Sequence, residues 1–562
     1  MPTPSLRPYV SQAPRTVARG DRHVGLRVGA YIGHRISQYI SEYISRYVGQ
    51  YVGLLALAVI LALPGCATLP DKLPKGPEGY AIEPLPGGAL ANLEAALKPK
   101  LAKDASGWRL LDTSEEALRY RIALVDSATH SIDLQYYFWW EDASGQLLMK
   151  HVVDAADRGV RVRIILDDLS TLLEDDRTPK VRDWETATLN AHPNIELRLY
   201  NPFKVRSLLG RGVDFLRRMD LMNQRMHNKL LVADNRTAIL GGRNIGNEYF
   251  GFATEFNFRD LDLLGAGPVA RQASSVFDRF WNSHWVVPVA ALQLHATRRD
   301  LRAEKPHMLE VLEGSPVLER LSLDRMPWQD LLDDFAKTAH TGTSQVVNDV
   351  PARKEVRHRM PKAMQDLMTS AQHELLIMNS YVIPDDGDVA LFNELRKRGV
   401  TVKILTNSLA SQDVPAVNSH YKRWRKPLIR AGVDLFETRP DAAIRSQVAD
   451  TPPVHAKFVG LHVKAIVVDR QKVFVGSMNL DPRSEELNSE MGVVVYSEPL
   501  AEQLAGIMER DMQPANAWRV TLNEHQALRW TADGPPLTRQ PARSTWQRMQ
   551  DAFFMLFPKN LY

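Results

Sequence analysis

This sequence has almost no cysteine, no apolar segment long enough to span a membrane, and little excess of either charge. Its 562 residues include one cysteine, Cys66, which excludes an intramolecular disulfide and a cysteine-based metal site. The apolar run that begins at Gly53 is shorter than the roughly 20 residues that a membrane-spanning helix needs. Because no clustered metal-ligand motif of the H-E-x-x-H kind is present, we expect neither a metal nor another cofactor.

The charges are nearly balanced, with 70 Lys and Arg against 66 Asp and Glu, for a net charge of +4. Dedicated nucleic-acid-binding proteins usually carry a strongly basic domain, so this balance argues against nucleic acid as a partner. It does not exclude a nuclease. The composition, 44% hydrophobic and 24% charged, is that of a globular protein. A chain of this length predicts two large domains with appendages.

The apolar run ends at Cys66 and has the length of the hydrophobic region of a signal peptide. The segment LPGC, Leu63–Cys66, resembles a bacterial lipobox, in which the cysteine is lipidated and becomes the mature N-terminus. The alternative is a short membrane anchor with an incidental cysteine. Since Ala67 follows instead of Asp, the resemblance implies the periplasmic face of the outer membrane. We therefore assign residues 1–66 to an N-terminal extension and lipoprotein signal peptide, and expect a lipid-anchored protein of the bacterial cell envelope.

The rest of the chain contains one helix-strand pattern twice. Helices alternate with buried strands, which predicts α/β layers with parallel strands, and the same order returns later in the chain. We predict two tandem α-β-α sandwich domains related by a pseudo-twofold axis, with the active site at their interface. The boundaries are a Pro/Gly-rich tether at 67–105, a first domain at 106–310, a linker at 311–350, a second domain at 351–530 and an amphipathic C-terminal tail at 531–562.

A repeated His-Lys-Asp pattern falls at equivalent places in the two halves. A single copy would be weak evidence, but both copies share the same downstream spacing of a small residue and an asparagine. The first copy comprises His227, Lys229, Asp234, Gly241, Gly242 and Asn244, and the second comprises His462, Lys464, Asp469, Gly476, Ser477 and Asn479, so that glycine follows each histidine by 14 positions.

A further His-x-Lys triplet, His455 and Lys457, lies just upstream of the second copy. Counted from His455, the position expected for Asp is occupied by His462, and the position expected for Gly is occupied by Asp469. We therefore predict that His455 and Lys457 are loop residues near the mouth of the pocket and that His462 is the repeated histidine.

These residue types suit chemistry on a phosphate diester. His and Lys two positions apart on a strand lie on one face, so each copy presents an imidazole, an ammonium and an amide together. One imidazole would attack phosphorus while the other protonates the leaving alkoxide and later activates the acceptor. The remaining groups would surround the phosphate oxygens with donors and leave room for them: Lys229, Lys464, Asn244, Asn479, Gly242 and Ser477.

With these motifs, residues 106–525 resemble the phospholipase D superfamily, whose mark is two His-Lys-Asp motifs. The segments QYYFW, MHNK, GGRNIGNEYF, NLDPRS and LNSEMGVVV are similar to bacterial cardiolipin synthases, especially the lipoprotein-like C-type branch. The resemblance implies that His227 is the nucleophile and His462 the general acid and base, with the reverse assignment open. Asp234 and Asp469 are expected to orient the site.

The resemblance also implies that Glu490, 28 positions after His462, is a carboxylate that holds a catalytic imidazole. In the first half, Glu255 has the same offset from His227, and Asp260 and Asp262 are rival counterparts.

The function implied is a phosphatidyltransferase that works through a phosphohistidine and makes cardiolipin with phosphatidylglycerol as acceptor. Phosphatidylglycerol, and also phosphatidylethanolamine, are the donors to consider. The alternatives are hydrolysis to phosphatidic acid, a periplasmic nuclease and a lipid-binding lipoprotein without activity. Basic and apolar residues mix in Phe203–Met222 and in the C-terminal segment from Trp546, which is typical either of a membrane-surface helix or of a helix packed on the body.

Overall fold

The computed structural model describes residues 73–169, 179–351 and 359–557. Cys66 and the predicted extension at 1–66 lie outside these ranges. Among the described residues, we find no helix with the length and apolar character that crossing a membrane requires.

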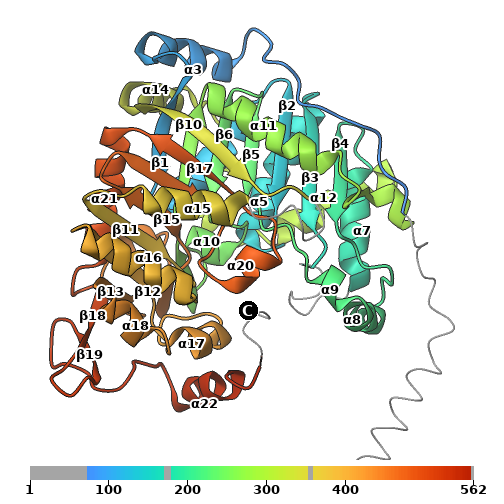
Figure 1. Ribbon diagram of the computed structural model, residues 1–562. Coiled ribbons are helices and arrows are strands. Elements are labelled where there is room, and N and C mark those ends of the chain that lie inside the picture. The colour runs from blue at the N-terminus through green and yellow to red at the C-terminus, as the bar shows by residue number, and fades with distance from the viewer. Residues whose placement is uncertain (1–72, 170–178, 352–358, 558–562) are drawn as a thin grey trace, which may run out of the picture. The chain divides into compact units, whose positions relative to one another are not determined.

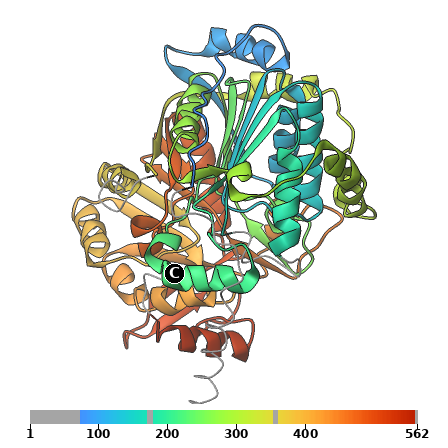
Figure 2. The ribbon, with the colours of Figure 1, turned by 90° about the vertical axis from the view of Figure 1, so that its right-hand side faces the viewer.

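The first half builds a sheet around three parallel strands, β2 (Ser131–Tyr136), β3 (Arg161–Asp167) and β4 (Ile195–Tyr200). These strands are rich in apolar residues because helices cover both faces of the sheet, as Figure 2 shows. Antiparallel strands extend the sheet in the order β9-β4-β3-β2-β5-β6-β8-β1. Their bounds are Ala105–Leu111 (β1), Leu230–Ala233 (β5), Thr237–Gly241 (β6), Asp262–Ala266 (β8) and Val286–Pro288 (β9).

The second half repeats this arrangement around the parallel strands β11 (Glu374–Asn379), β12 (Thr401–Asn407) and β13 (Val433–Thr438). The strand order is β10-β17-β16-β15-β11-β12-β13-β18-β19. The remaining bounds are His340–Asn348 (β10), Lys464–Val468 (β15), Lys472–Gly476 (β16), Met491–Tyr496 (β17), Ala517–Leu522 (β18) and Leu528–Thr531 (β19).

The two halves share one continuous sheet, because β1 pairs antiparallel with β10, with Trp108 opposite His340 (Figure 1). On either side of this pair, β8 borders β1 and β17 borders β10 in matching positions. This symmetry confirms the predicted tandem α/β fold. The helices beside the parallel strands are α4 (Ser114–Ser127), α5 (Ala143–Asp157), α7 (Pro179–Asn190), α12 (Arg298–Glu310), α15 (Arg359–Thr369), α16 (Asp386–Lys397) and α18 (Arg425–Arg430).

Two helices cross the boundary between the halves and form a common core. α11 (Pro268–Trp281) packs on β10 of the second half, and α21 (Glu498–Asp511) packs on β1 of the first. The buried residues of α11 recur at helical spacing, from Val269 to Trp281, and belong to one cluster with residues of β15, β17 and α21. The halves therefore form one cooperative body.

Two predicted boundaries differ from the structure. The predicted linker at 311–350 contains α13 (Val317–Arg320), α14 (Gln329–Thr338) and the central strand β10. The predicted tether at 67–105 ends in α3 (Ala89–Leu97) and a short 3-10 helix, Lys98–Lys100. The apolar side of α3, with Leu90, Leu93 and Leu97, is buried in the core of the first half, which the Pro/Gly-rich composition before it obscures.

The aspartates of the two motifs hold turns at the edge of the sheet away from the histidines. Asp234 follows β5 and accepts hydrogen bonds from the backbone amides of Thr129, His130 and Ser131, which lead into β2. Asp469 follows β15 and does the same for the residues that lead into β11. Since the motif histidine precedes each aspartate by seven positions of largely extended chain, roughly 20 Å separates them. Asp234 and Asp469 therefore hold the turns that lead into β2 and β11, and they lie apart from the two histidines.

We predict that Asp234→Ala destabilises the protein by about 2–4 kcal/mol, because it leaves three backbone amides, of which that of Ser131 is buried, without their acceptor. The shift in the midpoint of chemical denaturation measures this loss. Asp234→Asn, which keeps one side-chain oxygen, should lose less. An Asp234→Ala protein with native stability and no activity would instead place this residue in the chemistry.

Candidate active site

The backbone amide of each motif histidine donates a hydrogen bond to the opposite half of the protein. His227 precedes β5, and its amide donates to the carbonyl of Ser489 at 2.9 Å. His462 precedes β15, and its amide donates to the carbonyl of Arg259 at 2.8 Å. The second contact extends the parallel pair of β7 (Phe256–Arg259) and β14 (Phe458–Leu461). These matching connections bring the two histidines to the interface, as predicted.

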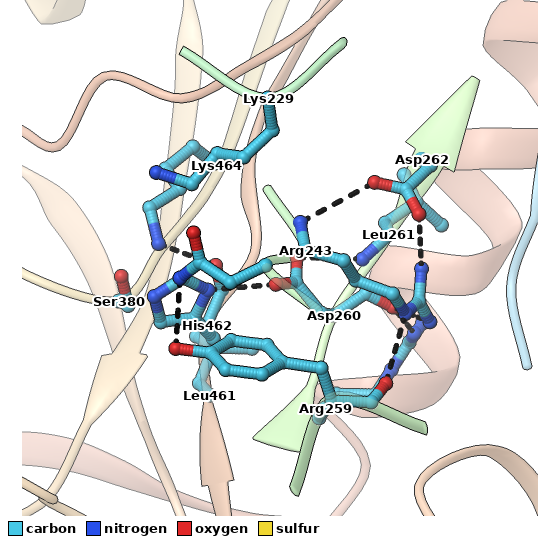
Figure 3. Close-up of polar contacts among 12 residues, drawn as sticks. Lys229, Arg243, Arg259, Asp260, Leu261, Asp262, Ser380, Leu461, His462 and Lys464 are labelled. Carbon is cyan, nitrogen blue, oxygen red and sulfur yellow. Dashed lines mark hydrogen bonds and ion pairs between the residues drawn. The ribbon is translucent and has the colours of Figure 1, made fainter. Parts of the chain in front are cut away.

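Each imidazole also contacts a carboxylate from the opposite half. Nδ1 of His227 lies 2.9 Å from both oxygens of Glu490. Nδ1 of His462 lies 2.7 Å from Oδ2 of Asp260, a contact that Figure 3 shows. Both carboxylates are fully buried. The halves thus exchange carboxylates, and each histidine–carboxylate pair is complete only when the halves are together.

Of the three candidate counterparts of Glu490, Asp260 occupies the equivalent place. Glu255 is exposed and pairs with exposed Lys457. Asp262 accepts hydrogen bonds from the guanidinium groups of Arg121 and Arg243. The two carboxylates do not lie at equal sequence distances from their motif histidines. The segment from the end of β6 to Asp260 is longer than the segment from the end of β16 to Glu490. The longer segment includes α10 (Asn247–Phe250) and the shorter one α20 (Pro482–Glu486).

The two motif lysines lie at the same site and bind the backbone of their own histidines. Nζ of Lys229 donates to the carbonyl of His227 at 2.8 Å, and Nζ of Lys464 donates to that of His462 at 2.6 Å. Figure 3 shows the two lysine side chains extending toward the same region beside His462. Burial lowers the pKa of Lys464 to about 8, and the pKa of Lys229 falls well below its usual value for the same reason.

The electrostatics of the site favour the neutral form of both imidazoles. Burial, followed by the nearby positive lysines, lowers the pKa of His227 and of His462 well below 6.5. A neutral imidazole that donates its Nδ1 proton to a carboxylate has a free lone pair on Nε2. Burial raises the pKa of Glu490 to about 7 and also raises that of Asp260.

The small motif residues support the carboxylates. The hydroxyl of Ser477 donates to Glu490, which also accepts from Nδ2 of Asn488 at 3.1 Å. At Gly242, a Cβ atom would lie 2.4 Å from Oδ1 of Asp260. The sequence predicted that Gly242 and Ser477 contact the phosphate, whereas the structure places both against the carboxylates that hold the histidines.

The motif asparagines lie beside the site and contact its walls. Nδ2 of Asn244 donates to the hydroxyl of Tyr249 at 2.9 Å, and Oδ1 of Asn479 accepts from the hydroxyl of Ser380 at 2.9 Å. Tyr249 in turn presents an edge contact to His462, with ring centroids 5.3 Å apart. The asparagines therefore order the aromatic and hydroxyl groups around the imidazoles.

Other site residues were missed by the sequence analysis. Tyr137 packs edge-on against His227 with centroids 5.0 Å apart, and Lys229 lies over the same ring. Arg243 and Arg259 both donate to the carbonyl of Asp260 and so fix its backbone. The sequence did not point to Arg243, because the second copy of the motif has Met478 at the equivalent position. The described residues contain no cluster of three His, Cys, Asp or Glu side chains suited to a metal ion.

Comparisons with known proteins agree with this geometry. The family described as "Cardiolipin synthase, PLD-like domain" matches residues 122–281 and 364–512, one segment in each half. Cardiolipin synthase C of Escherichia coli strain K12 is 36% identical over 469 residues, covering 80% of this chain and 94% of that protein. An uncharacterized protein of Helicobacter pylori strain 26695 is 32% identical and covers 83% of this chain and 90% of its own length.

A solved structure supports the fold. The crystal structure of phosphatidylserine synthase from Haemophilus influenzae Rd KW20 superposes with a TM-score of 0.50 at 14% identity, over 75% of this chain and 90% of that one. At this identity the likeness concerns the fold alone. Together with the sequence relatives, which match across both halves of the repeat, it leads to one conclusion. The chain belongs to the cardiolipin synthase family of phospholipase D-like enzymes.

Proposed function

We propose that the protein is a phosphatidyltransferase that forms cardiolipin from phospholipids, with phosphatidylglycerol as the acceptor. The observation that carries this proposal is the pair of buried histidines, each held at Nδ1 by a buried carboxylate of the opposite half. The relatives named cardiolipin synthase, which match over most of this chain, favour phospholipids as the substrates.

In the first step, Nε2 of His227 attacks the phosphorus of the donor lipid. The bond from phosphorus to the head-group oxygen breaks. His462 enters this step protonated at both ring nitrogens, a form that the negative charges of the bound phosphate and of Asp260 stabilise, and its Nε2 proton passes to that oxygen. Glu490 stabilises the charge that develops on the His227 ring, because it accepts the Nδ1 proton of that ring. Lys229 and Lys464 supply positive charge to the phosphate oxygens. The reverse assignment of the two histidines gives the same overall reaction.

In the second step, His462 removes the proton from an alcohol of the acceptor, and the resulting oxygen attacks phosphorus. The bond from phosphorus to Nε2 of His227 breaks, which restores the free histidine and releases the new diester. Water in place of the alcohol would give phosphatidic acid. Exclusion of water while the acceptor binds is therefore what separates transfer from hydrolysis.

Expression in a bacterial host that lacks cardiolipin tests this function. We expect new cardiolipin in the extracted lipids, and its loss with His227→Ala or His462→Ala, because either change removes one of the two proton and phosphoryl carriers. His455→Ala is the matched control, since this exposed histidine has no counterpart in the first half and should retain most turnover. Unchanged lipids together with DNA cleavage by the purified protein would support a nuclease instead.

The pH dependence of kcat/KM should be bell-shaped, with a maximum between about 7 and about 8. As the pH falls below about 7, Glu490 takes up a proton and no longer accepts from Nδ1 of His227, so the rate falls. As the pH rises above about 8, Lys464 loses the charge that attracts the phosphate, so the rate falls again. A soluble short-chain phospholipid serves as the substrate, because it avoids the surface charge of a bilayer.

Glu490→Gln should lower the rate by about 100-fold or more and remove the acidic limb. Glu255→Gln is the control, because Glu255 is exposed and contacts Lys457 instead of a catalytic histidine. An acidic limb near 7 that persists in Glu490→Gln would assign the titration to another group.

We further propose that Cys66 carries a lipid anchor that holds the enzyme at the periplasmic face of the outer membrane. This proposal is supported by the LPGC segment and by the position of the sole cysteine at its end. Globomycin should block processing of the precursor, and Cys66→Ser should do the same. Processing that continues in either case would contradict the lipid anchor.

A further inference from the structure

Helix α22 (Thr545–Phe554) buries its polar side and exposes its apolar side, the opposite of an ordinary surface helix. The residues that it turns toward the protein are polar, with Gln547 and Asp551 buried. The residues that it turns outward are large and apolar. The exposed apolar residues of α22 and the turn that follows are Trp546 (65% exposed), Met549, Phe553, Met555, Leu556 (80% exposed) and Phe557.

The inward polar face fixes this orientation. Asp551 accepts hydrogen bonds from Nζ of Lys422 at 2.8 Å and from Nδ2 of Asn418, a residue of α17 (Pro415–Tyr421). Nε2 of Gln547 donates to the carbonyl of Leu409 at 2.5 Å. If the helix rotated so that its apolar side were buried, Gln547 and Asp551 would lose these hydrogen bonds. Their buried partners on the body would then be left unpaired, which is costly. The apolar side is therefore held outward.

A second group of exposed apolar residues lies at the same edge of the sheet. Leu216, at 74% exposed, lies in the last turn of the helix α8 (Leu208–Arg217), and Met219 and Leu221 lie on α9 (Met219–Met222). α8 follows β4 and α17 follows β12, so both leave the sheet at the carboxyl ends of the parallel strands. In Figures 1 and 2, α8, α9 and α22 all lie in the lower part of the body.

The two histidines lie at this same edge. Asp167 at the end of β3 accepts from the amide of Met226, next to His227, and Asn407 at the end of β12 bonds the backbone of Leu461, next to His462. The carboxyl edge of parallel strands is where ligands bind in folds of this class. Exposed apolar residues thus come from each half at the edge that carries the two histidines.

The charges around α22 are those of a surface that meets anionic lipid. Within 539–557, the basic residues are Arg539, Arg543 and Arg548, and the sole acidic residue, Asp551, is buried. Basic groups beside inserted apolar side chains are typical of helices that lie in the interface of an anionic bilayer. A protein partner would not require this combination.

We propose that the exposed apolar residues of α22, together with those of α8 and α9, dock the enzyme on the surface of an anionic phospholipid bilayer. This docking surface places the carboxyl edge of the strands, with His227 and His462, toward the lipid head groups. The choice of a bilayer as the partner rests on the proposed function. Docking is separate from the anchor at Cys66, because it orients the catalytic body and does not merely tether it.

A fluorescent probe tests docking without any measurement of activity. In the full chain with Cys66→Ser, Met549→Cys provides a single thiol for an environment-sensitive dye, and the protein is reconstituted into vesicles that contain phosphatidylglycerol. We expect a blue shift and quenching by spin-labelled lipids. Lys397→Cys is the control, because this exposed residue ends α16 at the opposite edge of the sheet, where β12 begins. A probe at position 549 that stays in water, or that shifts as the protein is concentrated without lipid, would overturn the proposal.

Activity on two forms of one substrate separates docking from chemistry. Phe553→Ser with Leu556→Ser should lower turnover of phosphatidylglycerol in vesicles by about tenfold, and should change turnover of monomeric short-chain phosphatidylglycerol by less than about twofold. Tyr496→Ser is the matched control, because it removes an exposed aromatic ring at the end of β17 far from the site. Equal loss on both substrates, or no loss on vesicles, would overturn docking. If the unsubstituted protein were inactive on both vesicular and monomeric phosphatidylglycerol, the proposed function would be wrong. The fluorescence of the dye at position 549 would still show whether the protein docks on the bilayer.

Discussion

The hydrogen bond between Nδ1 of each histidine and a carboxylate of the opposite half is the interaction on which the site depends. Neither half holds a complete pair by itself, because Glu490 serves His227 and Asp260 serves His462. The shared sheet across β1 and β10 and the crossed helices α11 and α21 keep the halves in register. The common core is therefore a requirement of the chemistry as well as of stability.

Burial gives these groups their electrostatic character. Two lysines, two histidines and two carboxylates are packed in one place, and all six are buried with at most 8% of their surface exposed. Burial disfavours the charged form of every one of them, so the pKa values of the bases fall and those of the carboxylates rise. A phosphate diester that enters this site brings a negative charge to the two lysines and is stabilised there. The same environment favours the neutral form of an imidazole, which has the free lone pair that a nucleophile or a base needs.

The two half-sites are related by symmetry but differ in detail, and the differences lie around the carboxylates. Glu490 is held by the side chains of Ser477 and Asn488, whereas Asp260 is held through its backbone by Arg243 and Arg259. A glycine at position 242 gives Asp260 the space that Ser477 fills with a hydroxyl on the other side. The surroundings of the two histidines are therefore unequal, although the histidines themselves are related by the repeat.

The sequence by itself determined the duplication, the α/β class and the two His-Lys-Asp motifs, because repeated spacing and hydrophobic periodicity are local properties of the chain. It also singled out His462 over His455 by counting alone. Only the tertiary structure decided that Asp260, and neither Glu255 nor Asp262, matches Glu490, since the segments before the two carboxylates differ in length and strand pairing sets the true register. It also decided that Gly242 and Ser477 support carboxylates, that α3 and β10 belong to the folded body, and that α22 turns its apolar side outward. Each of these features depends on contacts between residues far apart in the sequence, and spacing along the chain does not predict such contacts.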